Sequence, residues 1–398
     1  MARKFRFAGS GLSDLESAGS AQTRGLHSME TICERLADGS LRHSEIRHIF
    51  EQLAVEGRRR IDAFVFELLF RNRMRAIAQE HAGLTLSFGW HIGYDGAGNS
   101  AYWFRLIDEE DGWNACDEAL LSHLAIQVQR SGIAIHVFRV MFRPDTNGFV
   151  SSERVSGAWR PERELAEALA DLTPPGTWRP PRSMDHMDTA MAYTAFDWMS
   201  KYPLLLSWLP ALSIQRRLMN CILSPALGRD PTDIDMMVLS PAGQLRCVEF
   251  KRKYPASGSQ SFGLDLHPHV NTVRMMDSMG IAPLHILLVA PRWQKNESPL
   301  HWLDDRALNT SWTWLAASLG GEDAFLGPPL KTHGWDSGQR NASRQQFSIS
   351  WSKIRRLHEG LKLGDEGGRR MVEFLTAGDL PAAPPATFHY LSARRLDR

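Results

Sequence analysis

The spacing of hydrophobic residues in the first half of the chain changes from helical to extended. Between Arg58 and His81, apolar residues recur every three or four positions, and this spacing predicts one long helix. Residues 84–92 alternate with period two, and residues 101–107 resume extended character after a glycine-rich turn, so the pair predicts a β-hairpin. A helix over 118–130 and a strand over 133–142 follow. We therefore expect an α+β domain in this part of the chain.

The second half begins after a segment that cannot form a regular helix or a central strand. Residues 172–182 hold four prolines and one glycine, so we expect a linker there. Beyond it, the pattern predicts a strand, a turn, a second strand, a helix and a third strand. These expected elements are strands over 232–239 and 244–251, a helix over 270–279 and a buried parallel strand over 284–290. Shorter patterns predict a strand over 219–223 and helices over 188–200, 352–362 and 369–375.

These patterns divide the chain into five expected parts. They are a flexible arm rich in Gly, Ser and Ala (1–25), an α+β domain (26–170), a Pro-rich linker (171–184), an α/β domain (185–335) and a C-terminal helical extension (336–398).

Composition and charge narrow the function classes. The chain has 398 residues, 43% of them hydrophobic, which fits a folded protein of two or three domains rather than a disordered one. A net charge of +1 means that any nucleic-acid binding has to come from a local basic patch. The four cysteines form no Cys-x-x-Cys pair, which argues against a disulfide framework or a structural zinc site. With no apolar run long enough to span a bilayer and no evident secretion signal, we expect a cytoplasmic protein without membrane contact.

Charged residues interrupt the first two strands of the second half at regular spacing. Side chains alternate faces along a strand, so Asp233 and Asp235 share one face of the first strand. Glu249 and Lys251 share one face of the second strand for the same reason. A tight hairpin places such strands side by side, roughly 5 Å apart. We therefore expect two or three carboxylates and one ammonium to converge at one end of the sheet.

Carboxylates in this arrangement suit a hard divalent cation. Mg²⁺ takes oxygen ligands and commonly only one or two carboxylates, which Asp235 and Glu249 would supply. The backbone carbonyl of Phe250 would add a third oxygen. A bound metal lowers the pKa of its water and stabilises charge on a phosphate. The expected cofactor is therefore Mg²⁺, with Mn²⁺ as a substitute.

Basic residues of the same segment would act on the phosphate. Lys251 would orient or deprotonate the attacking water, or neutralise charge that develops on the phosphorus centre. Arg252 and Lys253 follow directly and would bind the flanking phosphates of a nucleic acid.

The order of Asp235, a hairpin, Glu249-Phe-Lys251, a helix and a strand resembles the PD-(D/E)xK nuclease superfamily, which has the restriction-endonuclease-like fold. The run Ile-Asp … Val-Glu-Phe-Lys is most similar to Holliday-junction-resolvase-like and Mrr-like members. The resemblance covers roughly residues 185–291. It implies an α/β domain with an αβββαβ core and a mixed sheet, preceded by the separate α+β N-terminal domain. Residues 219–223 are the expected first strand of that core.

The resemblance also implies Mg²⁺-dependent hydrolysis of phosphodiester bonds in DNA by metal-activated water, with Asp235 and Glu249 as metal ligands and Lys251 as the catalytic cation. The family often has an acidic residue on the preceding helix, where Asp197 is favoured over Asp188 as an accessory ligand. Asp233 is either a second ligand or a strand-start cap. Such an endonuclease fits restriction, phage defence or mobile-element processing. Besides DNA, its partner would be a second copy of the chain, in a homodimer, or an accessory protein.

Two other interpretations stay open. Glu249 and Lys251 can form a surface ion pair of little value for stability, beside a merely polar strand entrance. The domain would then be a catalytically inactive nuclease-like module that binds nucleic acid or protein. A phosphotransfer or nucleotide enzyme is the other interpretation, and the absence of a Gly-x-x-x-x-Gly-Lys-Ser/Thr loop argues against its P-loop version.

Overall fold

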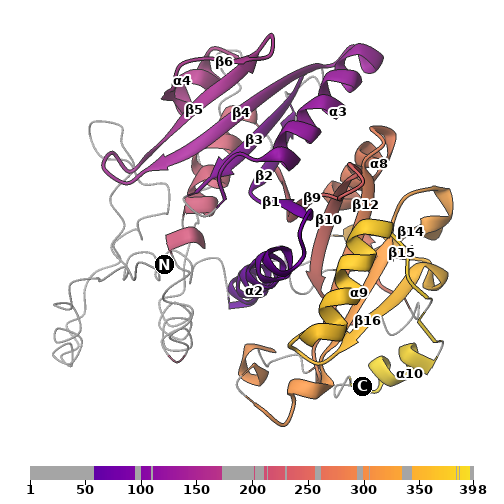
Figure 1. Ribbon diagram of the computed structural model, residues 1–398. Coiled ribbons are helices and arrows are strands. Elements are labelled where there is room, and N and C mark those ends of the chain that lie inside the picture. Colours follow the sequence, from indigo (N-terminus) through magenta and orange to yellow (C-terminus); the bar gives the residue numbers. More distant parts are fainter. Residues whose placement is uncertain are drawn as a thin grey trace, which may run out of the picture. The chain divides into compact units, whose positions relative to one another are not determined.

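The segment 232–239 joins two mixed β-sheets, and its path positions the candidate site (Figure 1). The segment forms β8 (Thr232–Ile234) in one sheet and β9 (Met236–Leu239) in the other, with Asp235 between them. The single strand predicted over these residues is therefore interrupted at Asp235, where the chain changes sheet. The computed structural model describes residues 58–94, 100–108, 111–172, 201, 210–212, 214–228, 231–255, 261–293, 299–303, 305–333, 343–381, 383–384 and 386–394. All of them belong to one compact unit of the chain, Thr31–Arg398.

Within the described residues, one sheet holds six strands in the order β1–β9–β10–β12–β13–β16. β1 pairs antiparallel with β9, β9 pairs antiparallel with β10, and β10 runs parallel to β12. The remaining strands of this sheet are β1 (Thr85–Ser87), β10 (Leu245–Arg252), β12 (Ala282–Val289), β13 (Thr313–Ser318) and β16 (Ile354–Glu359). The predicted hairpin and the predicted buried parallel strand are confirmed, and the helix α8 (Asn271–Ser278) between β10 and β12 lies where the sequence predicts it.

A second sheet has the strand order β6–β5–β4–β3–β2–β8 in the described part of the chain, and β7 pairs with β5 at its side. Its strands are β2 (Trp90–Tyr94), β3 (Ser100–Ile107), β4 (Ala134–Arg143), β5 (Gly148–Val155), β6 (Ala158–Trp159) and β7 (Arg163–Glu164). The predicted hairpin is confirmed for β2 and β3, but its first strand, predicted over 84–92, is interrupted, because residues 85–87 form β1 in the other sheet. The helix α3 (Ala115–Ser131) connects β3 to the parallel strand β4. A small sheet of β11 (Gly263–Asp265), β15 (Ser343–Ile349) and β14 (Phe325–His333) completes the described strands.

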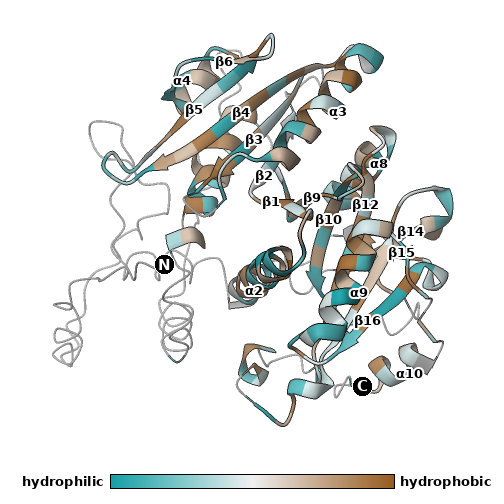
Figure 2. Ribbon diagram, viewed as in Figure 1, coloured by the Kyte–Doolittle hydropathy of each residue, from teal (hydrophilic) through white to brown (hydrophobic). Residues whose placement is uncertain are grey.

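Helices cover the sheets through apolar contacts. The predicted N-terminal helix is α2 (Arg58–Glu80), and Figure 2 shows hydrophilic and hydrophobic residues mixed along it. Phe70 of α2 stacks on Phe250 of β10 with ring centroids 4.4 Å apart. The helix predicted over 369–375 is part of α9 (Gly364–Ala377). The other described helices are α4 (Leu165–Ala170), α7 (Ser224–Leu227), α10 (Ala386–Ser392), the π-helices Leu218–Leu223 and Leu266–Val270, and single turns at Pro299–Trp302, Asn309–Ser311, Glu322–Ala324 and Trp351–Lys353.

The two faces of β10 enter different hydrophobic clusters. Val248 and Phe250 belong to a core that also contains the buried residues of α2 and α9. Leu245 and Cys247 belong to a core with residues of α3 and α8. Because side chains alternate along a strand, Glu249 and Lys251 continue the second face toward the end of β10. Packing on both faces therefore fixes the direction in which these two charged residues leave the sheet.

Two predicted elements are wrong. Residues 219–223 lie in a π-helix rather than in a strand, because a short, mostly apolar run does not distinguish a buried helix from a buried strand. Residues 352–362 contain the strand β16 rather than a helix. Leu315 pairs with Arg356 and Trp314 pairs with His358, so Leu357 is the extra residue of a bulge. The bulge leaves Ile354 and Leu357 both buried, and their three-residue spacing imitates a helix.

The two large sheets contain strands from more than one of the predicted domains. The arm 1–25 and residues 173–184 of the predicted linker lie outside the described residues. Strands from both sides of that linker occur in both large sheets, since β1 lies beside β9 and β2 lies beside β8. Residues beyond 335 also enter the six-stranded sheet through β16. The chain is an α/β protein with mixed sheets, as its sequence predicts.

Candidate active site

Asp235 lies at the point where the chain leaves one sheet for the other. Its carboxylate is buried, and Oδ2 accepts a hydrogen bond of 2.6 Å from the backbone N–H of Phe250. That N–H is available because the pairing of β9 with β10 ends at Met236 and Val248. The break in the strand therefore places one carboxylate over the end of β10 and fixes its orientation.

Gly89 makes the change of sheet possible on the neighbouring segment. β1 pairs with β9 and β2 pairs with β8 in one unbroken register, which puts Gly89 opposite Asp235. Gly89 has φ +77°, a conformation that side chains with a Cβ rarely adopt. A Cβ at this position would lie 2.8 Å from the carbonyl oxygen of Leu106. The two segments thus leave the six-stranded sheet together, and no side chain stands opposite Asp235.

The structure brings Asp235, Glu249 and Lys251 together. Lys251 Nζ lies 2.7 Å from Glu249 Oε1 and 3.9 Å from Asp235 Oδ2. The side chain of Lys251 is 31% exposed, whereas those of Glu249 and Asp235 are 13% and 4% exposed. The ammonium is therefore accessible to a ligand from solvent, while the two carboxylates lie deeper in the protein.

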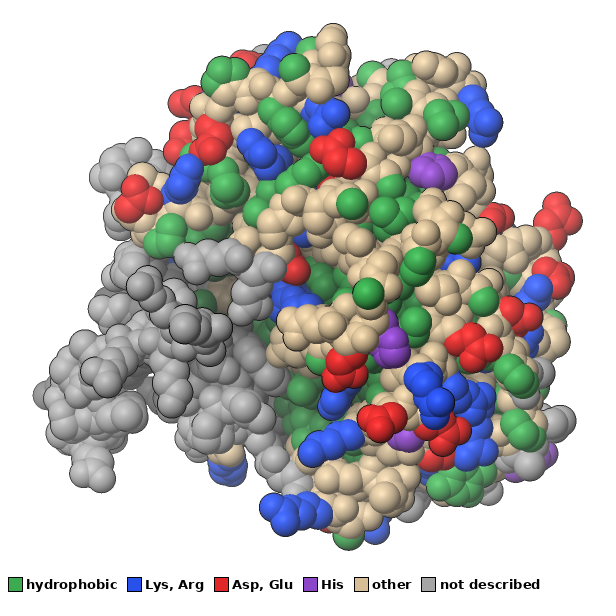
Figure 3. Space-filling view, viewed as in Figure 1, with side chains coloured by type: hydrophobic (Ala, Val, Ile, Leu, Met, Phe, Trp, Pro, Cys, Tyr) green, Lys and Arg blue, Asp and Glu red, His purple; other side chains and the backbone are tan. Residues whose placement is uncertain are grey.

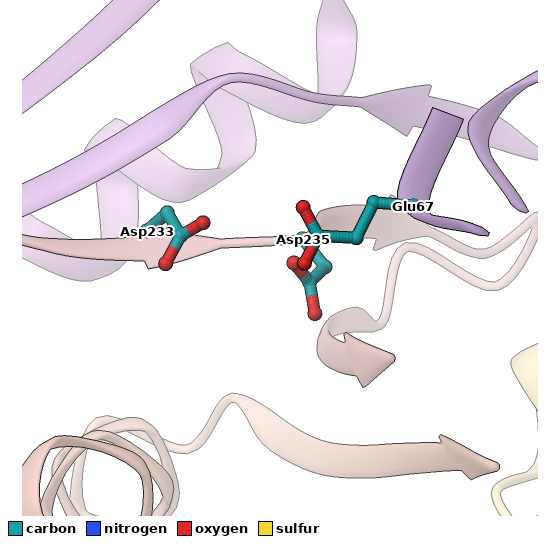
Figure 4. A group of neighbouring side chains, drawn as sticks. All are labelled: Glu67, Asp233 and Asp235. Carbon is teal, nitrogen blue, oxygen red and sulfur yellow. The ribbon is translucent and has the colours of Figure 1, made fainter. Parts of the chain in front are cut away.

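A third element adds a carboxylate that the sequence analysis does not select. Figure 4 shows Glu67 of α2 reaching toward Asp235, with Asp233 on the adjoining strand. One oxygen atom from each of Glu67, Asp233 and Asp235 lies within 4.8 Å of the other two. We call these three residues the carboxylate cluster. One signal for Glu67 is present in the sequence, since it is an acidic residue within the apolar run Phe64-Val-Phe-Glu-Leu-Leu-Phe.

Two members of the carboxylate cluster are disfavoured in their ionised forms. Burial raises the pKa of Glu67 to about 7, where the charges of Asp233 and Glu249 add to the rise and Lys251 opposes it. Burial also raises the pKa of Asp235 well above its ordinary value, and the neighbouring carboxylates raise it further. The ionised forms of Glu67 and Asp235 are therefore unfavourable unless a cation binds beside them.

Glu249 and Lys251 have the opposite balance. Burial disfavours the ionised form of Glu249, but the close nitrogen atoms of His269 and Lys251 hold its pKa well below the ordinary value. Burial likewise opposes the charge of Lys251, but the carboxylates around it hold its pKa well above the ordinary value. Both groups are therefore ionised at neutral pH.

Two histidines that the sequence analysis does not select contact Glu249. Nδ1 of His269, just before α8, lies 2.9 Å from Glu249 Oε1. His285 of β12 is paired with Glu249 in the parallel ladder, and its Nδ1 lies 2.9 Å from the Glu249 carbonyl oxygen. Burial lowers the pKa of His285 to about 4, so its imidazole is neutral. These contacts limit the orientations that Glu249 can adopt.

The other predicted site residues lie in varied surroundings. Phe250 packs its ring on α2, and its N–H binds Asp235 as described above. The Arg252 guanidinium lies 5.4 Å from the centroid of the Phe66 ring, on the α2 side of β10. Lys253 donates a hydrogen bond through Nζ to the carbonyl oxygen of Gly263. Asp197, the predicted accessory ligand, and Asp188 lie outside the described residues.

Comparisons with known proteins leave the site to be interpreted from its own geometry. No family model, no curated protein and no solved structure matches the chain. None of the helices in the described residues combines the length and the apolar character that a membrane span needs.

Proposed function

We propose that this protein is a divalent-metal-dependent nuclease that hydrolyses phosphodiester bonds in DNA. The observation that carries the proposal is the convergence of the carboxylate cluster, Glu249 and Lys251 at the break between β8 and β9. Carboxylates that can hold a metal ion, together with an ammonium that can contact a phosphate, are groups that suit metal-dependent phosphodiester hydrolysis.

The order of elements around the site supports the same proposal. The helix α2 is followed along the six-stranded sheet by β1, β9 and β10, then by α8 and the parallel strand β12. This is the αβββαβ order that the resemblance to the PD-(D/E)xK superfamily implies, with β1 in place of residues 219–223 as the first strand. Glu67 then takes the position on the preceding helix for which the sequence analysis favours Asp197. Residues 90–231, which include most of the second sheet, would be an insertion between the first two strands.

The residues of the site fit a divalent cation. The oxygen atoms of Glu67, Asp233 and Asp235 are close enough to share one ion, and a bound cation would favour the ionised forms of Glu67 and Asp235, which burial and the neighbouring carboxylates disfavour. Mg²⁺ and Mn²⁺ both accept such oxygen ligands. When bound, the ion would lower the pKa of a water molecule and stabilise negative charge on a phosphate.

The chain itself supplies orientation and a fixed positive charge. The Phe250 N–H holds one oxygen of Asp235, and His269 contacts one oxygen of Glu249. Because the surrounding carboxylates keep Lys251 protonated, its ammonium would bind a phosphate oxygen or orient the attacking water rather than act as a base. Of the two interpretations of Asp233, as ligand or as strand-start cap, its membership in the carboxylate cluster favours the ligand.

The choice of DNA as substrate rests on the resemblance to the PD-(D/E)xK superfamily. Restriction, phage defence or mobile-element processing are the biological roles that we propose. On the face of the molecule seen in Figure 3, acidic and basic side chains are interspersed. The phosphate backbone would accordingly be bound by local cations such as Lys251 rather than by an extended basic surface.

The proposal is tested by incubating wild-type protein with supercoiled, linear, single-stranded and branched DNA and with RNA, in Mg²⁺, Mn²⁺ or EDTA. We expect cleavage of DNA by the wild type that is absent in EDTA and in Glu249→Ala. Glu322→Ala, which removes an exposed carboxylate, is the matched control and should cleave like the wild type. Binding of DNA without cleavage in either metal would instead indicate a catalytically inactive binding module.

A further inference from the structure

One half-buried arginine of α2 has N–H donors that the described residues leave unused. Arg71 forms neither a hydrogen bond nor a direct ion pair with any described residue. Other basic residues of this region are engaged. Arg75, one turn further along α2, forms an ion pair with Asp111. Lys253 donates a hydrogen bond to the carbonyl oxygen of Gly263. Because a guanidinium has only donors, Arg71 suits a negatively charged ligand that is rich in oxygen atoms.

Helix geometry and an aromatic contact place Arg71 beside the carboxylate cluster. Arg71 follows Glu67 by four residues on α2, so the two are neighbours on one face of the helix, with Cβ atoms about 5–6 Å apart. The Glu67 side chain of this face reaches toward Asp235 (Figure 4). The Arg71 guanidinium lies 5.9 Å from the centroid of the Phe88 ring. Phe88 directly precedes Gly89, the residue opposite Asp235, so the helix and the crossing segment both bring Arg71 to the cluster.

The contact with Phe88 holds the guanidinium without using its donors. An aromatic ring attracts a guanidinium through the face of the ring, and the N–H groups at the guanidinium edge stay available. Their planar arrangement matches two oxygen atoms of one phosphate. Glu67 and Asp233 are only half-buried, so a ligand can approach the carboxylate cluster from the solvent side. A phosphate that reached this side of the cluster would lie about one helical turn from Arg71.

We propose that Arg71 binds a phosphate of the DNA backbone next to the carboxylate cluster. The inference rests on the proposed function, but on the binding of DNA rather than on its cleavage. It gives Arg71 a role that the sequence analysis assigns to Arg252 and Lys253. Those two residues are engaged elsewhere, with the Arg252 guanidinium beside the buried Phe66 ring and Lys253 on a backbone carbonyl. Because the contact positions the backbone without touching a base edge, it contributes affinity and no sequence preference.

The test is the salt dependence of DNA binding by the full-length protein. Fluorescence anisotropy of a labelled DNA duplex is measured in Ca²⁺, which takes oxygen ligands as Mg²⁺ does, and electrophoresis verifies that the DNA stays intact. Arg71→Gln should weaken binding about tenfold. It should also reduce the slope of log K against log salt concentration by about 0.9, the value for one lost phosphate contact. Arg71→Lys keeps the charge but not the planar donor pair, so it should keep the slope and lose only part of the affinity.

Arg73→Gln is the matched control, because residues two positions apart on a helix do not share a face. It should retain both the affinity and the slope of the wild type. Unchanged binding by Arg71→Gln, an equal loss in Arg73→Gln, or a wild type that binds no DNA would overturn the inference. Binding that depends on Arg71 as expected, without cleavage in Mg²⁺ or Mn²⁺, would support the inference and refute the nuclease proposal. DNA cleavage by a wild type whose binding slope does not change in Arg71→Gln would do the reverse.

Discussion

The Arg105–Asp117 pair and the carboxylate cluster both bury charge beside the segment that contains β1 and β2. The first combines opposite charges, whereas the second brings like charges together. Asp117 is completely buried and accepts hydrogen bonds from the Trp90 indole, the Arg105 guanidinium, the Ser87 hydroxyl and the Asn114 backbone N–H. Arg105 also donates hydrogen bonds through Nη1 to the carbonyl oxygen of Leu106 and through Nη2 to that of Asp111. In the carboxylate cluster, three acidic groups face one another instead.

The Arg105–Asp117 pair is charge that supports the fold, whereas we propose that the charge of the carboxylate cluster serves to bind a cation. The Arg105–Asp117 pair is electrically balanced and its hydrogen bonds are satisfied by the chain, so it joins β3 to the start of α3. The carboxylate cluster is unbalanced, and burial together with mutual repulsion raises the pKa values of Glu67 and Asp235. Substitutions in the first group should therefore reduce stability, whereas substitutions in the second should reduce activity.

The largest expected effect is on cleavage. Lys251→Met removes the ammonium beside Glu249 and should lower the cleavage rate by about 10²–10³-fold, because a fixed positive charge at a reacting phosphate is lost. Metal binding should be retained, since Lys251 is not a ligand. Rates under single-turnover conditions measure the loss. Lys362→Met, which removes an exposed lysine, is the control and should cleave normally.

The next largest effect is on stability. Asp117→Ala leaves the Arg105 guanidinium buried without its carboxylate and should lower the free energy of unfolding by about 3–5 kcal/mol. Urea titration followed by circular dichroism measures the change. Glu118→Gln alters the next residue, whose side chain is 50% exposed, and should cost less than about 1 kcal/mol. If Asp117→Ala and Asp233→Asn changed stability equally, the contrast between the two buried groups would be wrong.

A smaller effect concerns the pH dependence of the metal-free protein. The folded state raises the pKa of Glu67 from 4.5 to about 7, so it favours the protonated carboxyl. The stability that this group contributes is complete below pH 4.5 and is lost as the pH rises through about 7. Glu67→Gln should therefore be more stable than the wild type at pH 8, by about 1–2 kcal/mol, and equally stable at pH 4.

Thermal unfolding of both proteins in EDTA across this pH range measures the difference. Saturating divalent cation should reverse the order at pH 8, because the wild type then binds the ion more tightly than Glu67→Gln does. A wild type that is no less stable than Glu67→Gln in EDTA at pH 8 would show that the cluster is not short of positive charge.

The smallest expected effect tests the crossing between the sheets. Gly89→Ala places a Cβ 2.8 Å from the Leu106 carbonyl oxygen, in a backbone conformation with φ +77°. Gly243→Ala has a similar φ of +74° but no atom within 4 Å of the added Cβ. Both substitutions should cost stability, and Gly89→Ala should cost about 1 kcal/mol more. Equal unfolding midpoints for the two variants would show that the crossing tolerates a side chain.

Local patterns in the sequence were sufficient for the β-hairpin that carries Glu249 and Lys251. Alternation along β9 and β10, a short turn and a following helix all act over neighbouring residues, and the parallel strand β12 has the continuous apolar character of a buried strand. The same alternation correctly placed Glu249 and Lys251 on one face.

Long-range pairing could not be predicted in this way. The identity of β1 as the partner of β9 depends on residues more than 140 positions apart, for which one sequence has no signal. The place of Glu67 in the site was missed for the same reason, since the strands of the second sheet lie between α2 and β9 along the chain. The interruption at Asp235 was also missed, because the residues of β8 and β9 follow one continuous strand pattern.

Binding of a divalent cation by the carboxylate cluster is tested most directly by calorimetric titration of Mg²⁺ and Mn²⁺ into the wild type and Asp235→Asn. The wild type should bind a divalent ion near neutral pH and release protons as it binds, because Glu67, whose pKa is about 7, is partly protonated beforehand. Binding by Asp235→Asn should be at least about tenfold weaker. Undetectable binding by a folded wild type, or equal affinity in Asp235→Asn, would contradict the proposed cation site.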